Sequence, residues 1–326
     1  MIPGVQSLER LQAEWRFDLS AIEIVLRLMD MLERIRESAL LRDRLVLKGG
    51  SALNLCFPPL LRLSVDLDFN VLGGIGRDEM LREKPRVLDA LTAIARRAGY
   101  RLQTSAPEHA GQKLYLRYES ALGGQGGIQI DLNFLYRVPV GDVQERALWN
   151  PLEKEVVPVL VVSSAELVAG KLLAMLDRAA PRDLFDAASF AKKTELDSSS
   201  DAARQTFVAL SGTLDRALFE YDRGRFDSIT DASVSMTLHP LLHANERPAS
   251  SALKRAAWET VSPWLKLRPE EREYCERIQQ GEFRPDLLCP DDEPFAQVLR
   301  SHPALLWKVE NAKRHARRGP SPRDGT

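Results

Sequence analysis

Hydrophobic residues recur every three or four positions through most of the first forty residues, with charged side chains between them. This spacing places the hydrophobic side chains on one face, so it predicts helices across residues 7–40. The same reasoning predicts a helix over residues 77–98. The hydrophobic positions that define the clearest helical face are Ile22, Val25, Leu26, Met29, Leu32 and Ile35.

The middle of the chain carries shorter hydrophobic patterns that are typical of strands. The run at 45–47 predicts a strand that leads into a glycine pair and a helix-like segment, and 156–162 predicts another strand. Further strands with one buried face are expected where hydrophobic and polar residues alternate. The segments with this alternation are 61–71, 114–118 and 128–136, the last two joined by a glycine-rich turn over 123–127.

After about residue 150 the pattern becomes mostly helical. Ser163 and Glu166 have the spacing of a capping box at the start of a helix that runs to Arg178. A second helix is expected after Pro181, and residues 200–318 look mostly helical.

These elements together predict an α/β (α+β) fold, in which helices surround a core sheet. The expected regions are N-terminal helices at 1–40, an α/β core at 41–162, a large C-terminal helical region at 163–312, and a disordered basic tail at 313–326.

The composition excludes several classes of protein. The 326 residues are 44% hydrophobic and 28% charged, as in ordinary globular proteins. A formal net charge of −1 argues against a polycation that coats nucleic acid or an anionic membrane. The three cysteines include no C-x-x-C pair, which fits a reducing cytosol.

Neither a secretory leader nor a membrane span is expected. The first residues have no basic segment followed by an apolar one. The most apolar stretch, 156–162, is far shorter than the roughly 20 residues that span a bilayer. We therefore expect a cytoplasmic protein with no membrane contact.

The most informative segment is the acidic strand around Asp66. Side chains alternate between the faces of a strand, so Ser64, Asp66 and Asp68 share one face. Two adjacent carboxylates repel each other, and a divalent cation removes that repulsion by accepting their oxygens as ligands. The alternative is a solvated strand edge with no ligand.

A second strand offers another carboxylate. Asp131 alternates with hydrophobic neighbours and points away from the core with Gln129 and Asn133. Together with Asp66 and Asp68 it could complete a metal site of the type that drives in-line phosphoryl or nucleotidyl transfer. Taken alone, Asp131 is an ordinary surface acid.

A glycine turn supplies a candidate phosphate site. In Lys48-Gly49-Gly50-Ser51 a strand leads into a helix, so backbone N–H groups could approach a phosphate at the helix N-terminus. Ser51 could bind a phosphate oxygen or merely cap the helix. The Walker pattern is absent.

A cationic helix completes the set. Lys171 and Arg178 lie seven residues apart, so one helix face presents both. Asp183 and Asp186 follow on the next helix and could hold these cations in place. The alternative is an ordinary ion pair between helices, Arg178 with Asp183.

The order of these motifs resembles the AbiEii/AbiGii nucleotidyltransferase toxins, which include the mycobacterial MenT enzymes. The resemblance covers roughly residues 45–190. The motifs that carry it are Lys48-Gly49-Gly50-Ser51-Ala52-Leu53, Arg62-x-Ser64-x-Asp66-x-Asp68-Phe69 and Lys171…Arg178-x-x-x-Arg182-Asp183-x-x-Asp186.

The resemblance implies a fold, an activity and partners. The fold would be a polymerase-β-like nucleotidyltransferase core. The activity would be transfer of a nucleoside monophosphate from an NTP, with Mg²⁺ or Mn²⁺, onto an acceptor such as tRNA. A cognate antitoxin would be encoded nearby.

The resemblance also assigns roles to individual residues. Lys48, Gly49, Gly50 and Ser51 would form the nucleotide-binding loop, with Gly50 and Ser51 on the phosphates. Asp66 and Asp68 would bind the metal, Lys171 and Arg178 the nucleotide, and Asp183 or Asp186 would complete the catalytic site. Ser64 would lie beside the nucleotide and be a candidate phosphorylation site. A phosphate there would add about −1.5 to −2 charge beside Asp66 and repel a triphosphate.

Two alternatives to a toxin that modifies tRNA stay open. The acceptor could be a protein hydroxyl or a small molecule, because the near-neutral charge is unusual for a tRNA-binding protein. A basic stripe that includes Arg96, Arg97 and Arg101 would favour RNA instead. The chain could also be a non-catalytic module that binds a nucleotide or a partner.

Overall fold

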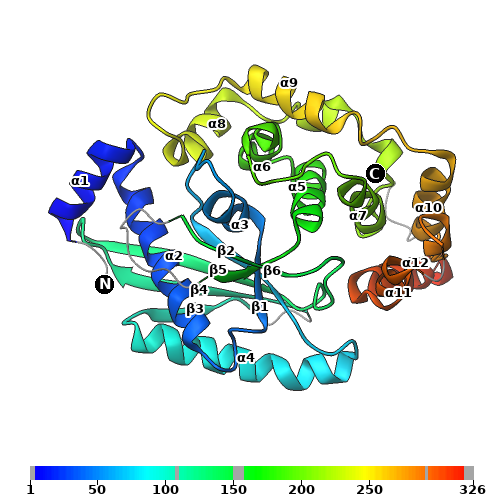
Figure 1. Cartoon of the computed structure of the whole chain (residues 1–326), viewed down its shortest axis with the longest axis horizontal. Helices are drawn as coiled ribbons and strands as arrows, with labels where there is room; N and C mark the ends of the chain where they lie inside the picture. The colour runs from blue at the N-terminus through cyan, green and yellow to red at the C-terminus, as the bar shows by residue number, and fades with distance from the viewer. Residues whose placement is uncertain (1–3, 107–109, 150–157, 291–292, 319–326) are drawn as a thin grey trace, which may run out of the picture.

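The computed structural model describes residues 4–106, 110–149, 158–290 and 293–318 (Figure 1). In these residues a single mixed sheet of seven strands has the order β3-β4-β5-β2-β1-β7-β6. The strands are β1 (Leu45–Lys48), β2 (Asp66–Val71), β3 (Arg101–Thr104), β4 (Gly111–Glu119), β5 (Gln125–Asn133), β6 (Gln144–Arg146) and β7 (Val159–Val161).

Helices lie on both sides of this sheet, as Figure 1 shows, with α4 on one side and α3, α5 and α6 on the other. The later helices, α8 to α12, follow one another around the outside. The helices are α1 (Val5–Trp15), α2 (Leu19–Glu37), α3 (Gly49–Cys56), α4 (Arg77–Arg97), α5 (Ser164–Arg178), α6 (Pro181–Ala188), α7 (Asp201–Ser211), α8 (Asp231–Thr237), α9 (Ser250–Val261), α10 (Pro269–Gln279), α11 (Pro294–Ser301) and α12 (Pro303–Arg318).

The predicted α/β (α+β) class is confirmed, with N-terminal helices and a helical C-terminal region around the sheet. Local chemistry explains the elements that the pattern predicted. Helix α2 begins where the Asp18 carboxylate accepts hydrogen bonds from the backbone N–H groups of Ser20 and Ala21. One hydrophobic face of α2 is buried.

The three central strands align the residues of interest. Strands β1 and β2 are antiparallel, with Lys48 opposite Asp68. Strands β2 and β5 are parallel, with Asp68 opposite Asp131. Their hydrophobic side chains, such as Leu67 and Ile130, are buried on the other face. The alternation predicted for these strands therefore exists and brings the two carboxylates together.

Two predicted strands have other bounds in the structure: 61–71 is longer than β2, and 128–136 lies three residues later than β5. Strand β2 begins only at Asp66, because the preceding segment bonds to a distant loop: Leu63 N–H donates to Leu241 O at 2.8 Å. Strand β5 ends at Asn133, whose side-chain oxygen accepts from the N–H groups of Leu135 and Tyr136 and turns the chain.

Two predictions about helix ends are corrected. Ser163 caps α5, but the Glu166 carboxylate does not reach back to close a capping box; it accepts from Val140 N–H at 3.0 Å instead. The tail predicted to be disordered from residue 313 is helical through Arg318, because α12 continues. Residues 319–326 lie outside the described residues. None of the described helices has the length and apolar character needed to cross a bilayer.

Candidate active site

A cavity of about 470 Å³ lies between the sheet and helices α5 and α7. Its lining brings together six of the residues predicted for the site, from four elements and the turn after β1. They are Lys48, Gly49, Asp68, Asp131, Lys171 and Arg178. A larger cavity of about 660 Å³, beyond the end of α3, has none of the predicted site residues in its described lining.

Two of the predicted carboxylates, Asp68 and Asp131, line this cavity, and Asp66 lies outside the lining on the same strand as Asp68. Asp68 lies beside Asp131 across parallel strands and shares its face of β2 with Asp66. Burial, and then the negative charge of Asp66, raise the pKa of Asp68. Asp66 and Asp131 are more open, with side chains 29% and 31% exposed. A positive charge placed among these oxygens would relieve their repulsion.

The donor set fits a hard divalent cation, although it forms no complete metal centre by itself. Asp66, Asp68 and Asp131 offer only oxygen donors, which Mg²⁺ prefers. No cluster of three His, Cys, Asp or Glu side chains in the described part of the chain is close enough to hold an ion alone. Mg²⁺ is usually bound by one or two carboxylates together with substrate phosphates and water. A site with few carboxylates therefore fits an ion whose other ligands come from a nucleotide and from water.

The glycine turn sits directly against the acidic strand. Gly49 has φ +68°, and a Cβ there would lie 2.5 Å from Asp68 Oδ2. A Cβ on Gly50 would lie 2.7 Å from Arg62 Nη2 and 2.9 Å from Ser64 Oγ. Both positions therefore require glycine for close approach.

Ser51 does not cap α3, and its predicted contact with a phosphate stays a prediction. It is fully buried, and its hydroxyl donates to the backbone carbonyl of Asp66. The N-cap of α3 is Lys48, which makes no side-chain capping bond. Ser51 thus fastens the start of the helix to the start of β2.

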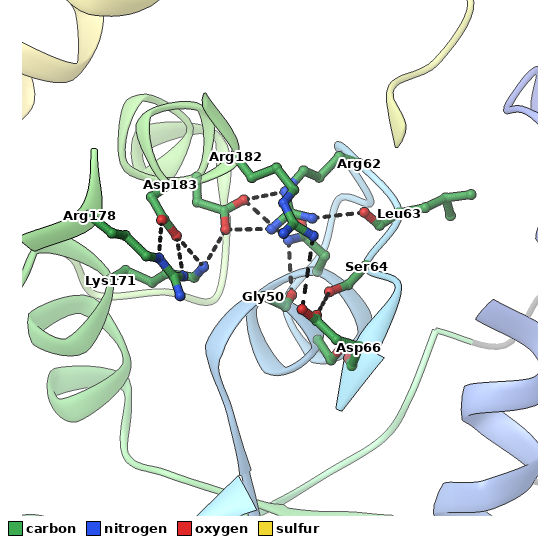
Figure 2. A network of polar contacts seen from close by, with 12 residues as sticks. Gly50, Arg62, Leu63, Ser64, Asp66, Lys171, Arg178, Arg182 and Asp183 are labelled. Atoms are coloured by element: carbon green, nitrogen blue, oxygen red, sulfur yellow. Dashed lines mark hydrogen bonds and ion pairs between the residues drawn. The ribbon is translucent and has the colours of Figure 1, made fainter. Parts of the chain in front are cut away.

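The cations of α5 are held by the acids of α6 (Figure 2). Lys171 Nζ lies 2.6 Å from Asp186 Oδ2 and 3.4 Å from Asp183 Oδ1. Arg178 forms two bonds to Asp183, at 2.5 and 2.8 Å. Burial alone would raise the pKa of Asp183, but the Arg178 hydrogen bond and the charge of Lys171 outweigh it and lower that pKa.

Arg62 is the central residue that the sequence interpretation left without a role. Its guanidinium forms two bonds of 2.7 Å to Asp186 and one of 2.8 Å to Leu63 O. Burial opposes the charge on Asp186, yet Arg62 and Lys171 lower its pKa. Asp186 is 1% exposed and lies outside the cavity lining, so it positions Lys171. Hydrophobic and polar residues alternate through the segment before Ser64, which places Arg62 on the same face as Ser64. This alternation is the feature of the sequence that could have indicated a role for Arg62.

Comparison with known proteins identifies the family. A model of the AbiEii family, described as a nucleotidyl transferase toxin of type IV toxin–antitoxin systems, matches residues 30–260. The chain belongs to this AbiEii family. A search of curated proteins finds no significant match.

Solved structures support the fold of this AbiEii toxin. MenT4, a nucleotidyltransferase toxin from Mycobacterium tuberculosis H37Rv, aligns over 92% of this chain and 98% of its own, with a TM-score of 0.58 and 18% identity. A candidate nucleotidyltransferase from H. pylori covers 79% of this chain and 97% of its own, at 17% identity. The TM-score of this second alignment is 0.44.

In this AbiEii chain the candidate phosphorylation site is enclosed. Ser64 is 1% exposed, and its hydroxyl donates to Asp66 Oδ1 at 3.3 Å. Arg182 also contacts Asp66, with Nη1 3.9 Å from Asp66 Oδ2 (Figure 2). Phosphorylation of Ser64 would require its hydroxyl to become exposed, and this modification stays a prediction.

The cavity also contains polar residues for which no role in the site was predicted. They are Asn70, Asn133 and Glu166, and the part of the cavity that they line is called the inner end. Asn70 and Asn133 are two residues after Asp68 and Asp131, so they lie on the same face of their strands. This alternation could have indicated from the sequence that both asparagines belong to the site. Glu166 also lines the cavity and accepts the side-chain N–H of Asn70 at 3.2 Å. Burial raises the pKa of Glu166 to about 7, although the Val140 N–H bond and the charge of Lys48 act against it.

Proposed function

We propose that this AbiEii toxin transfers a nucleoside monophosphate from an NTP to a hydroxyl acceptor, with Mg²⁺ or Mn²⁺ as cofactor and tRNA as the acceptor. The observation that carries the proposal is the shared cavity. Carboxylates from two strands, a glycine turn and two cations of α5 line one space of about 470 Å³. Each group matches a part of an NTP or its metal ion.

The positive groups would bind the triphosphate. Lys171 is 4% exposed and fixed by two acids, so it presents a point charge at a constant position. Arg178 is 61% exposed and bonds Asp183 through Nε and Nη2, so its Nη1 can donate to a phosphate. Backbone N–H groups at the start of α3 would add hydrogen bonds from the Gly49–Gly50 turn.

The metal would be held by Asp66, Asp68 and Asp131 rather than by the acids of α6. Asp183 and Asp186 are buried, and Lys171 Nζ lies 3.4 and 2.6 Å from their oxygens. Asp131 is 31% exposed, its Oδ2 lies 3.6 Å from Lys113 Nζ, and it is adjacent to Asp68. When bound, the ion would neutralise developing charge on the phosphates and activate the attacking hydroxyl.

The reaction would be an in-line displacement. The acceptor oxygen forms a bond to the α-phosphorus while the bond from this phosphorus to the pyrophosphate oxygen breaks. The hydroxyl proton passes to a carboxylate of the cavity, and pyrophosphate leaves. The contribution of the protein is to orient the chain of phosphates between Lys171 and the acids.

The tRNA acceptor and the antitoxin are proposed from the family and from the surface. Exposed arginines lie near one end of the sheet, where Arg101 and Arg117 are opposite each other on β3 and β4. Arg96 and Arg97 at the end of α4 are also exposed. This cluster supports contact with a phosphate backbone. A cognate antitoxin would be the protein partner of a type IV toxin.

Nucleotide transfer can be tested with each α-³²P-labelled NTP, Mg²⁺ and a total cell lysate. We expect label in RNA, concentrated in tRNA, and none without divalent ions. Label in protein or small molecules instead would support the alternative acceptors. No label in any fraction would reject the proposed function.

Matched variants connect the assay to the cavity. Asp68→Asn and Asp131→Asn should each reduce transfer by about 100-fold or more, because they remove charge that acts in the transition state. Asp43→Asn is the control, since its side chain is 74% exposed and is not among the residues that line the cavity. Full activity of Asp68→Asn would show that the acids do not form the catalytic site.

A further inference from the structure

The cavity changes character along strands β2 and β5. Asp68 and Asp131 mark the charged end, and two residues further along each strand lie Asn70 and Asn133. At about 3.3 Å per residue, the amides are about 6.6 Å from the carboxylates. A ribose bridges a phosphate and a base over a similar separation, so a nucleotide with its phosphates at the acids would reach the amides with its base.

The hydrogen-bonding orientation of both amides is set by the protein. Asn70 Nδ2 donates to Glu166 Oε1 at 3.2 Å, and its Oδ1 has no partner among the described residues although the side chain is 2% exposed. Asn133 Oδ1 accepts from two backbone N–H groups, at 2.8 and 3.2 Å. Asn133 therefore has its Nδ2 left to donate.

A buried acceptor without a donor is unfavourable, so a ligand that supplies a donor to Asn70 Oδ1 would remove this cost. The two asparagines are register partners on adjacent strands. They thus form an ordered pair, with an acceptor on β2 beside a donor on β5. Such a pair matches one edge of a planar group that has a donor next to an acceptor.

One wall of the cavity could take the face of a flat ring. It includes small and hydrophobic residues of α5 and of the segment that begins at the end of α7, and the polar residues Asp177 and Thr213 of the same segments also line the cavity. Gly170 lies inside α5, where glycine is less favourable than alanine, and a Cβ there would meet no heavy atom within 4 Å. The residues of this wall are Leu167, Gly170, Ala174, Leu210 and Leu214.

We propose that the inner end of the cavity is the nucleobase subsite of the enzyme. Asn70 and Asn133 read the hydrogen-bonding edge of the base, and the wall around Gly170 takes its face. The inference rests on the proposed function, because it assumes that an NTP occupies the charged end.

The order of acceptor and donor makes the subsite selective. Cytosine presents an amine beside a ring acceptor, whereas uracil presents a carbonyl beside a ring N–H, so their donors and acceptors are reversed. A site with a set order therefore accepts one of the two and leaves unpaired groups with the other. We expect CTP and UTP to differ in affinity by about tenfold or more.

The test measures dissociation constants by calorimetry with Mg²⁺, on the full-length chain, for CTP, UTP and inorganic tripolyphosphate. Asn70→Ala should bring CTP and UTP to within about twofold of each other, because it removes the oriented acceptor. Gly170→Leu should weaken both NTPs about tenfold or more by filling the space of the base. Tripolyphosphate binding should stay unchanged in both variants, which also reports that they fold. Asn245→Ala, in an exposed turn, is the control.

Three results would overturn the inference. Equal weakening of NTPs and tripolyphosphate by Gly170→Leu would place the phosphates there instead of the base. Unchanged NTP binding in both variants, with a raised KM for RNA in the transfer assay, would assign the inner end to the acceptor. Wild-type protein that binds neither NTPs nor tripolyphosphate would reject the proposed function itself.

Discussion

Replacement of Arg62 by methionine tests whether the buried ion-pair network supports the fold and the site. Arg62 is 3% exposed and holds Asp186 with two bonds of 2.7 Å. In Arg62→Met the Asp186 carboxylate keeps Lys171 at 2.6 Å and a bond from Asn54 at 3.3 Å. The variant therefore leaves a buried carboxylate with only part of its compensation.

The expected loss follows from the geometry. A hydrogen bond to a charged group contributes about 1.5–3 kcal/mol, so two such bonds correspond to about 3–6 kcal/mol. Breaking a buried ion pair by removing one partner costs about 3–5 kcal/mol. We therefore expect Arg62→Met to lower the free energy of unfolding by about 3–5 kcal/mol. Transfer activity should fall as well, because Asp186 positions Lys171.

The measurement is urea unfolding followed by circular dichroism, with the midpoint and slope fitted together. Arg34→Met is the matched control: Arg34 and Asp30 are also 2.7 Å apart, but the arginine is 40% exposed. An exposed pair on a helix contributes less than about 1 kcal/mol. If Arg62→Met and Arg34→Met lower the free energy of unfolding by the same small amount, burial does not make the Arg62–Asp186 pair more important for stability than the exposed pair.

Three further predictions concern the turn, a buried acid and the thiols. Gly49→Ala should abolish nucleotide transfer and lower stability by about 1–2 kcal/mol, since its Cβ would lie 2.5 Å from Asp68 Oδ2 at a φ of +68°; a fully active variant would contradict this. Burial raises the pKa of Glu166 from 4.5 to about 7, so the folded state favours the protonated acid and this stabilisation is present at low pH and lost as pH rises through 7. Between pH 4.5 and 8, Glu166→Gln should gain about 3 kcal/mol of stability relative to wild type in urea unfolding, and parallel pH profiles would contradict it. All three cysteines are buried, and burial raises the pKa of Cys56 to about 12, so Ellman's reagent should label none in the folded protein and three after unfolding; rapid labelling of the folded protein would show that a thiol is open.

The sequence predicted those features that depend on short-range periodicity. The helical face around Ile22, the helix over 77–98 and the alternation around Asp68 and Asp131 all appear in the structure. Each of these features depends on side chains only a few positions apart in the chain. The periodicity of hydrophobic and polar residues therefore predicts them directly. The pairing of Lys171 with the acids that follow it is local in the same sense.

Errors occurred where a distant segment decided the local structure. Residues 61–65 alternate like a strand, but Leu63 pairs with Leu241 and leaves the sheet. The spacing of the motifs could not show whether Asp186 or Asp131 lines the cavity. That choice depends on Arg62, which lies 124 residues before Asp186 in the chain and neutralises it in a buried pair.

The sequence by itself determined the chemical groups of the site and their order: a glycine turn, paired acids, a cationic helix and the acids behind it. Only the tertiary structure decided which acids are open and which are already bound to cations, and it alone disclosed the amides of Asn70 and Asn133 at the inner end. The physical reason is that burial and charge pairing, which control the state of a carboxylate or an amide, arise from contacts between residues far apart in the chain.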